Sequence, residues 1–223
     1  MEVLNRIPTP TVTSGEEELL GNHLVLRDIS WETYEKLLEI FSDRSIPRIT
    51  FYRGTLELIV PGTERQVYSW NLGQLVVELT AAMGLEIIGF KSSTWRSKPK
   101  ATGKEADESF YIQNEAKVRN KLQIDLTVDP PPDLAIEVYF THSSIDAMSV
   151  YAELKVPEVW LWRKGKLTIN LLKEGGYVES EKSLAFGSFP IKEIAQFMNF
   201  ESDQGHNAKM REFRKWVRAN LPQ

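Results

Sequence analysis

Cysteine is absent from this chain of 223 residues, and histidine occurs only three times. The absence of cysteine excludes disulfides, thiolate zinc sites and cysteine nucleophiles. The histidines, His23, His142 and His206, do not have the spacing of a zinc-binding helix, so a zinc centre is not expected. The functions that depend on thiols or on zinc are therefore set aside.

Long apolar runs and a targeting segment are missing as well. The N-terminal residues have neither the basic start nor the apolar block of a signal peptide, and no apolar stretch is long enough to span a bilayer. We therefore expect a cytoplasmic protein without a membrane partner. The net charge of −4 argues mildly against a protein that coats nucleic acid, although local basic patches remain compatible with it.

The length and the order of patterns indicate one mixed α/β domain. Residues 1–20 are expected to form a flexible tail, and residues 21–223 a single domain that ends in an amphipathic helix near 207–221. A helix is expected from Ser30, then a hairpin around Arg53 and Gly54, and a second helix over 64–83. Later strands and a helix over 143–154, capped by Ser143 or Ser144, complete a mixed sheet flanked by helices.

Three acidic residues stand inside or at the start of apolar strands. They are Glu57 in TLELIV, Asp107 before ESFYI and Glu137 in DLAIEVYF. A carboxylate in such a place is costly unless it is paired, hydrogen-bonded or bound to a metal ion. The three acids are therefore a candidate site for a hard cation, Mg²⁺ or Mn²⁺. Structural ion pairs, or a position on an exposed edge, are the alternative.

Strand geometry narrows the choice of ligands. Asp133 and Glu137 share one strand face but are roughly 13 Å apart, too far to hold the same ion. The partner of Glu137 must come from another strand, and Asp107 is the best candidate. His142, which follows this strand, is a candidate general base or a polar surface residue.

A polar, basic loop without acidic residues is expected from Lys91 to Lys104, and it leads into Asp107. Its members are Lys91, Arg96, Lys98, Lys100 and Lys104. Next to a metal site they could bind the phosphate backbone of DNA, and a solvated loop is the equally acceptable alternative. Trp95, within this stretch, is more typical of a core residue than of a base-stacking one.

The segments GTLELIVPGTERQVYSWNLG, PPDLAIEV and YAELKVPEVW resemble the Uma-two family of restriction-endonuclease-like proteins. The similarity runs from about Trp31 to Phe197 and implies the PD-(D/E)XK nuclease fold. It places the aspartate of that motif on Asp107, its second acid on Glu137 and an early glutamate on Glu57. In such nucleases the acids bind Mg²⁺, and a lysine helps to orient the attacking water.

The sequence departs from the family pattern at several positions. Tyr139 stands where the lysine would follow Glu137, and Ala147 stands where relatives carry a lysine on the next helix. Arg65 replaces a histidine, and Ala106 replaces the proline before the aspartate. The resemblance thus implies a Mg²⁺-dependent DNA endonuclease with catalytic residues Glu57, Asp107 and Glu137, impaired by the missing lysine. The alternative is an inactive nuclease-fold module that binds nucleic acid or protein.

The resemblance also implies a homodimer. Trp160 and Trp162 lie two residues apart on one strand face, which predicts that they pack against a helix or against another subunit.

Overall fold

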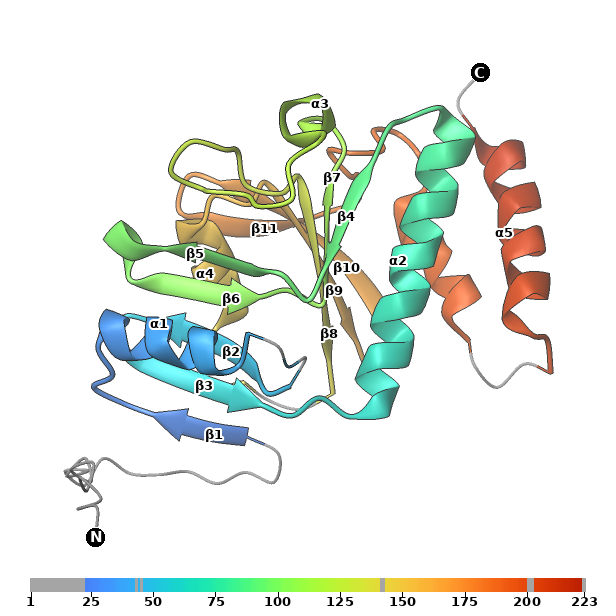
Figure 1. Cartoon of the computed structure of the whole chain (residues 1–223). Helices are drawn as coiled ribbons and strands as arrows, with labels where there is room; N and C mark the ends of the chain where they lie inside the picture. The colour runs from blue at the N-terminus through green and yellow to red at the C-terminus, as the bar shows by residue number, and fades with distance from the viewer. Residues whose placement is uncertain (1–22, 43, 45, 141–142, 200–202, 222–223) are drawn as a thin grey trace, which may run out of the picture.

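Two β-sheets and the helices around them form the chain (Figure 1). The computed structural model describes residues 23–42, 44, 46–140, 143–199 and 203–221. The tail expected at residues 1–20 and the candidate base His142 lie outside the described residues. No helix within these ranges is long and apolar enough to cross a membrane. The mixed α/β fold class is confirmed, whereas the single-domain organisation stays a prediction.

Sheet A contains the predicted hairpin. Its five strands have the order β1-β3-β2-β6-β5, with every neighbouring pair antiparallel. The bounds are β1 His23–Leu26, β2 Arg48–Tyr52, β3 Thr55–Ile59, β5 Thr94–Ser97 and β6 Thr102–Glu105. Arg53 and Gly54 form the two-residue turn between β2 and β3, and both have positive φ.

Sheet B contains the predicted apolar strand of Glu137. Its six strands have the order β11-β10-β9-β8-β7-β4, antiparallel except for the parallel pair β8 and β9. The bounds are β4 Ile88–Lys91, β7 Glu108–Tyr111, β8 Leu134–Tyr139, β9 Glu158–Arg163, β10 Lys166–Lys173 and β11 Gly176–Ser180. Helix α4 (Ala147–Glu153) connects β8 to β9.

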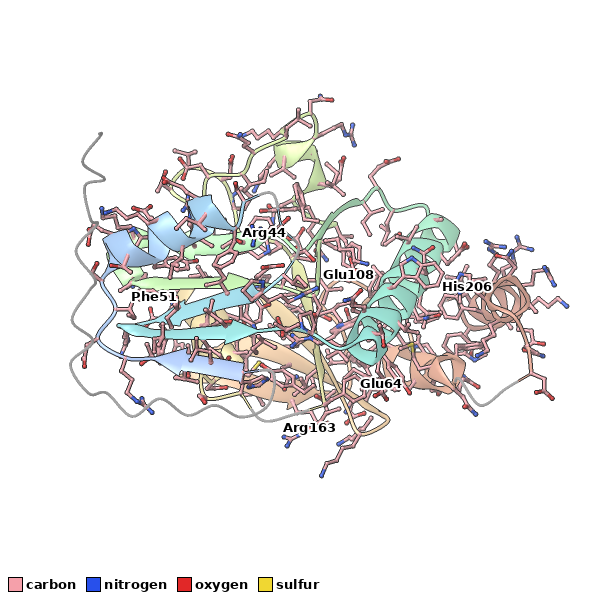
Figure 2. All side chains as sticks on the ribbon, turned by 60° about the horizontal axis from the view of Figure 1, so that its bottom comes forward. Arg44, Phe51, Glu64, Glu108, Arg163 and His206 are labelled. Atoms are coloured by element: carbon pink, nitrogen blue, oxygen red, sulfur yellow. The ribbon has the colours of Figure 1, made fainter. Side chains whose placement is uncertain are left out.

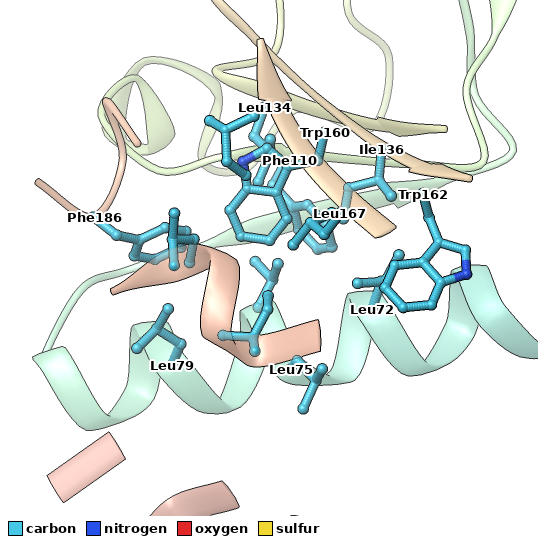
Figure 3. Close-up of a cluster of buried hydrophobic side chains, with 14 of the residues drawn as sticks. Leu72, Leu75, Leu79, Phe110, Leu134, Ile136, Trp160, Trp162, Leu167 and Phe186 are labelled. Carbon is cyan, nitrogen blue, oxygen red and sulfur yellow. The ribbon is translucent and has the colours of Figure 1, made fainter. Parts of the chain in front are cut away.

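The main core lies between sheet B and two helices (Figure 3). Helix α2 (Thr63–Met83) ends at Gly84, which has the left-handed conformation, as predicted. Its apolar face packs with Trp160 and Trp162, so these tryptophans contact a helix rather than a second subunit. Helix α5 (His206–Asn220) and the 3₁₀ segment Ile191–Met198 cover the same core.

Two smaller cores place sheet A against the rest of the molecule. Helix α1 (Trp31–Ile40), capped by the Ser30 side chain, covers one face of sheet A, and Phe51 lies beneath it (Figure 2). A further cluster joins Trp95 of β5 to α4 and to the inner face of sheet B. Trp95 is thus a core residue, as expected.

Two local predictions are wrong. The polar stretch expected as a loop forms strands β5 and β6 around the short 3₁₀ turn Lys98–Lys100, because Trp95 and Thr102 are buried in sheet A. Helix α4 is capped by Asp146, whose carboxylate accepts from the N–H groups of Met148 and Ser149. The remaining helix, α3 (Glu115–Val118), is a single turn.

Candidate functional site: a buried acidic pair

Asp107 and Glu137 meet where sheet A, sheet B and α2 come together. Asp107 directly precedes β7, which pairs with β8, and Glu137 lies in β8. The next residue along the chain from Asp107, Glu108, is seen between sheet A and α2 in Figure 2. The predicted proximity of the two acids is therefore present in the fold.

Arg65 from the beginning of α2 lies between the two carboxylates. Its Nε donates to both oxygens of Asp107, at 2.9 Å and 3.0 Å. Its Nη2 donates to Oε2 of Glu137 at 3.2 Å. One guanidinium group therefore bridges both acids, which is the position that a shared metal ion would need.

Two more cations reach the pair from sheet A. Arg48 in β2 places Nη1 at 2.6 Å from Oδ1 of Asp107. Lys104 in β6 places Nζ at 3.3 Å from Oε2 of Glu137. The lysine expected on the nucleic-acid surface thus lies inside the protein, with 5% of its surface exposed.

Two neutral groups also donate hydrogen bonds to the pair, one to each carboxylate. The backbone N–H of Val138 donates to Oδ2 of Asp107 at 2.8 Å. The hydroxyl of Tyr151 donates to Oε1 of Glu137. Burial, together with the Glu137 charge, raises the pKa of Tyr151 far above its usual value, so the phenol keeps the proton that it donates. Each of the four carboxylate oxygens consequently has at least one donor.

The surroundings act in different ways on Arg65 and on Glu105. Burial on its own would lower the pKa of Arg65, but Asp107 and Glu137 outweigh it and raise that pKa. Burial raises the pKa of the neighbouring Glu105 carboxyl to about 7, and Arg48 opposes this. Three cations thus face two carboxylates, with Glu105 as a third acid at the edge, 3.9 Å from Arg48.

Glu57 makes a separate set of contacts. It is buried in β3, where its carboxylate accepts from Ser143 Oγ at 2.5 Å and from the Ser144 N–H at 2.7 Å. His23 Nδ1 lies 3.9 Å away. In the described part of the chain, no group of three acidic or histidine side chains is arranged to hold a metal ion. The structure therefore joins Asp107 to Glu137 and uses Glu57 to tie β3 to the loop after β8.

The other basic residues of the predicted surface each face an acid. These pairs, 3.6 Å to 3.7 Å apart, are Lys91–Glu108, Arg96–Glu35, Lys98–Glu32 and Lys100–Glu153. The four cationic side chains remain about half exposed or more, between 48% and 64%. Exposed pairs of this length are weak, so the cations stay accessible but their charge is locally balanced.

A cavity of about 320 Å³ lies beside Glu137. Its lining includes Tyr139 and Ala147, the two positions at which the family resemblance would place a lysine. Neither side chain carries a charge at neutral pH, and burial raises the pKa of Tyr139 further above its usual value. Lys104 is thus the lysine that contacts Glu137, and it comes from the basic stretch that was expected on the nucleic-acid surface.

The side chains around the pair do not fit a divalent ion as they are arranged. Mg²⁺ binds carboxylate oxygens and keeps several waters. Here all four oxygens already accept from protein donors, and three of these donors are cationic. A dication placed between Asp107 and Glu137 would have to displace Arg65 and would add two charges to a buried, already cationic cluster.

An aspartate before one strand and a glutamate within its neighbour is the arrangement that the resemblance implies for restriction-endonuclease-like proteins. The model of the Uma2 family, described as "Putative restriction endonuclease", matches residues 31–195, and the chain belongs to this family. No curated protein matches the chain. A solved structure described as a "putative nuclease belonging to DUF820 from Anabaena variabilis ATCC 29413" is similar at 12% identity. It has a TM-score of 0.47, over 81% of this chain and 98% of that one.

Proposed function

We propose that this chain is a nuclease-fold interaction module that does not hydrolyse phosphodiester bonds with a divalent ion. The supporting observation is Arg65, which bridges Asp107 and Glu137 where a shared ion would bind. The uncharged residues Tyr139 and Ala147 support the proposal, since removal of a charge that stabilises the transition state typically costs on the order of 10²–10³ in rate.

A cleavage assay tests the absence of hydrolysis. Supercoiled plasmid is incubated with the full chain in Mg²⁺ or Mn²⁺, next to the Asp107→Ala variant. We expect both proteins to leave the plasmid intact at the same background level, and calorimetry with Mn²⁺ to show no binding. Cleavage that requires the metal and disappears in Asp107→Ala contradicts the proposal.

A metal-dependent DNA endonuclease is the second candidate, with Asp107 and Glu137 as metal ligands and Glu57 as an accessory acid. Family membership favours it, and so does the position of Lys104, 3.3 Å from Glu137. Lys104 would then take the part of the lysine missing after Glu137, and Arg65 would have to leave the pair. The same assay separates the two candidates, with Lys104→Met as a further variant that would lose activity.

DNA is the proposed partner, and Lys91, Arg96, Lys98 and Lys100 are the proposed contacts. Because each of these cations faces an acid, we expect weak binding without sequence preference, with Kd on the order of 10⁻⁴–10⁻⁶ M. Fluorescence anisotropy with a labelled DNA duplex over a series of salt concentrations measures this Kd and its dependence on salt. Replacing the four residues by alanine should reduce the salt dependence, and replacing Lys164, Lys166 and Lys173 serves as the control. Equal effects of the two sets would reject this surface.

Homodimerisation stays a prediction. The resemblance implied it, and the strand face of Trp160 and Trp162, which was compatible with it, is buried beneath α2, so a dimer would need another surface. Light scattering that gives the mass of one chain would reject it.

A further inference from the structure

The acidic pair and its three cations come from three layers of the fold. Arg48 and Lys104 belong to sheet A, Arg65 belongs to α2, and the two acids belong to sheet B and its entry. Hence each ion pair crosses from one layer to another. No other cluster of ionised side chains in the described residues connects these three layers at such low exposure, with four members at 6% or less.

We propose that the acidic pair is a metal-independent ionic joint that holds sheet A and α2 to sheet B, with Arg65 as its central cation. This inference goes beyond the absence of hydrolysis, because it assigns a stabilising role to the cluster.

The direction in which a charge-removing substitution changes the thermal stability distinguishes a joint from a metal site. In a site built for a cation, two neighbouring carboxylates repel each other without the ion, so neutralising one of them stabilises the metal-free protein. In a joint, neutralising Asp107 leaves Arg48 and Arg65 buried with too little negative charge, which is strongly destabilising. The two interpretations therefore predict opposite changes in thermal stability.

Further hydrogen bonds, two of them to backbone groups, strengthen the joint. Arg48 donates from Nη1 to the carbonyl of Ala106 at 3.0 Å and from Nη2 to Ser92 Oγ at 3.1 Å. Asp107 accepts from the N–H of Val138 in β8. The charged side chains therefore fix the chain that leads into β7 as well as one another.

An exposed ion pair between sheet A and α4 provides a control. Arg53 at the turn of sheet A donates to Glu153 at the end of α4, 2.7 Å away, with 65% of the arginine side chain exposed. Glu153 also lies 3.7 Å from the exposed Lys100. Solvent screens both pairs, so their loss should change little. Glu153→Gln thus removes one carboxylate charge between sheet A and α4 without disturbing a buried cation.

Thermal unfolding of the full chain tests the inference. We expect Asp107→Asn to lower Tm by on the order of 10 °C, and Glu153→Gln to lower it by about 2 °C at most. The wild-type Tm should be the same in EDTA and in Mn²⁺, since no ion contributes. Arg65→Met should also lower Tm, but by less, because Arg48 and Lys104 still neutralise the acids.

A double-mutant cycle with Arg48→Met keeps the test decisive even if Asp107→Asn does not fold alone. Combined with Asp107→Asn, it should restore part of the lost Tm, because both buried charges are then removed. An unchanged or higher Tm in Asp107→Asn, or a wild-type Tm that rises in Mn²⁺, overturns the inference. Metal-dependent plasmid cleavage by a protein that Asp107→Asn destabilises would refute the proposed function and leave the joint standing.

Discussion

At the residue scale, one arginine determines what two carboxylates can bind. The cost of placing Asp107 and Glu137 in apolar strands could be predicted from the sequence, and so could the two remedies, a metal ion or ion pairs. The choice between them could not, because Arg65 lies 42 residues from Asp107 and 72 from Glu137 along the chain. In the sequence, Arg65 could be recognised only as a departure from the family pattern, and its contact with the two acids could not be predicted.

Gly103 shows how closely sheet A packs against α1. A Cβ atom at this position would lie 2.1 Å from Tyr34 Oη and 2.8 Å from Tyr34 Cζ, and Tyr34 is fully buried. We expect Gly103→Ala to lower the free energy of unfolding by ~3 kcal/mol, at the upper end of overpacking effects. Urea denaturation measures the change. Gly62→Ala, where no atom lies within 4 Å, should cost less than about 1 kcal/mol through the weaker helix cap.

Because Glu158 is a buried carboxyl group, we expect the stability of the protein to depend on pH. Burial raises the pKa of this carboxyl, although Trp160 Nε1 and the N–H of Leu184 donate to it at 2.5 Å and 2.7 Å. The folded protein therefore holds this proton more tightly than the unfolded chain does. The contribution of Glu158 to the free energy of unfolding is fully present below the ordinary pKa of a carboxyl group. It is lost as the pH rises through the raised pKa of the folded state.

The variant Glu158→Gln isolates this contribution. Its stability should fall less steeply than that of the wild type as the pH rises from about 4 towards neutrality. It should also be less stable at every pH by about 1–3 kcal/mol, since an amide N–H group would face the backbone donors. Parallel pH profiles of the two proteins in urea denaturation would contradict the assignment.

At the element scale, periodic segments were predictable and polar ones were not. The helix expected over 64–83 is observed as Thr63–Met83, because its apolar residues recur at helical spacing and Gly84 ends it. Strands β5 and β6 were expected as a loop, because lysines, a proline and a glycine obscure the alternation. Strand β1 was not expected at all, since its four residues become a strand only by pairing with β3.

The burial of individual residues along α2 offers a direct test of how this helix packs on sheet B. Leu75 is fully buried against sheet B, whereas Val77, two residues further on, is 41% exposed. We expect Leu75→Ala to cost about 2–5 kcal/mol of unfolding free energy, and Val77→Ala to stay within about 0.5 kcal/mol. Denaturation curves of the two variants measure these changes in the free energy of unfolding. Similar losses in both would mean that α2 is rotated relative to the arrangement described.

At the scale of the whole molecule, the class of fold could be predicted but the division into two sheets could not. Alternating helices and strands indicate a mixed α/β domain. Sheet A, however, brings β2 next to β6, about fifty residues apart, as in the pairing of Phe51 with Gly103. Such pairings depend on side chains from distant segments, among them the cations that meet Asp107 and Glu137.

Hydrogen exchange can show how far the two sheets depend on each other. The ionic joint and the cluster around Trp95 are shared by both sheets, so we expect the wild-type chain to unfold in a single transition. In Asp107→Asn the joint is weakened while the core beneath α2 is intact. Amides of β2 and β6 should then lose protection before those of β9 and β10, when followed by mass spectrometry of peptic fragments. Because Glu153→Gln alters only the exposed pairs with Arg53 and Lys100, between sheet A and α4, its exchange pattern should match the wild type. If both sheets lost protection equally in Asp107→Asn, the cluster would act on the stability of the whole domain rather than as a joint between its sheets.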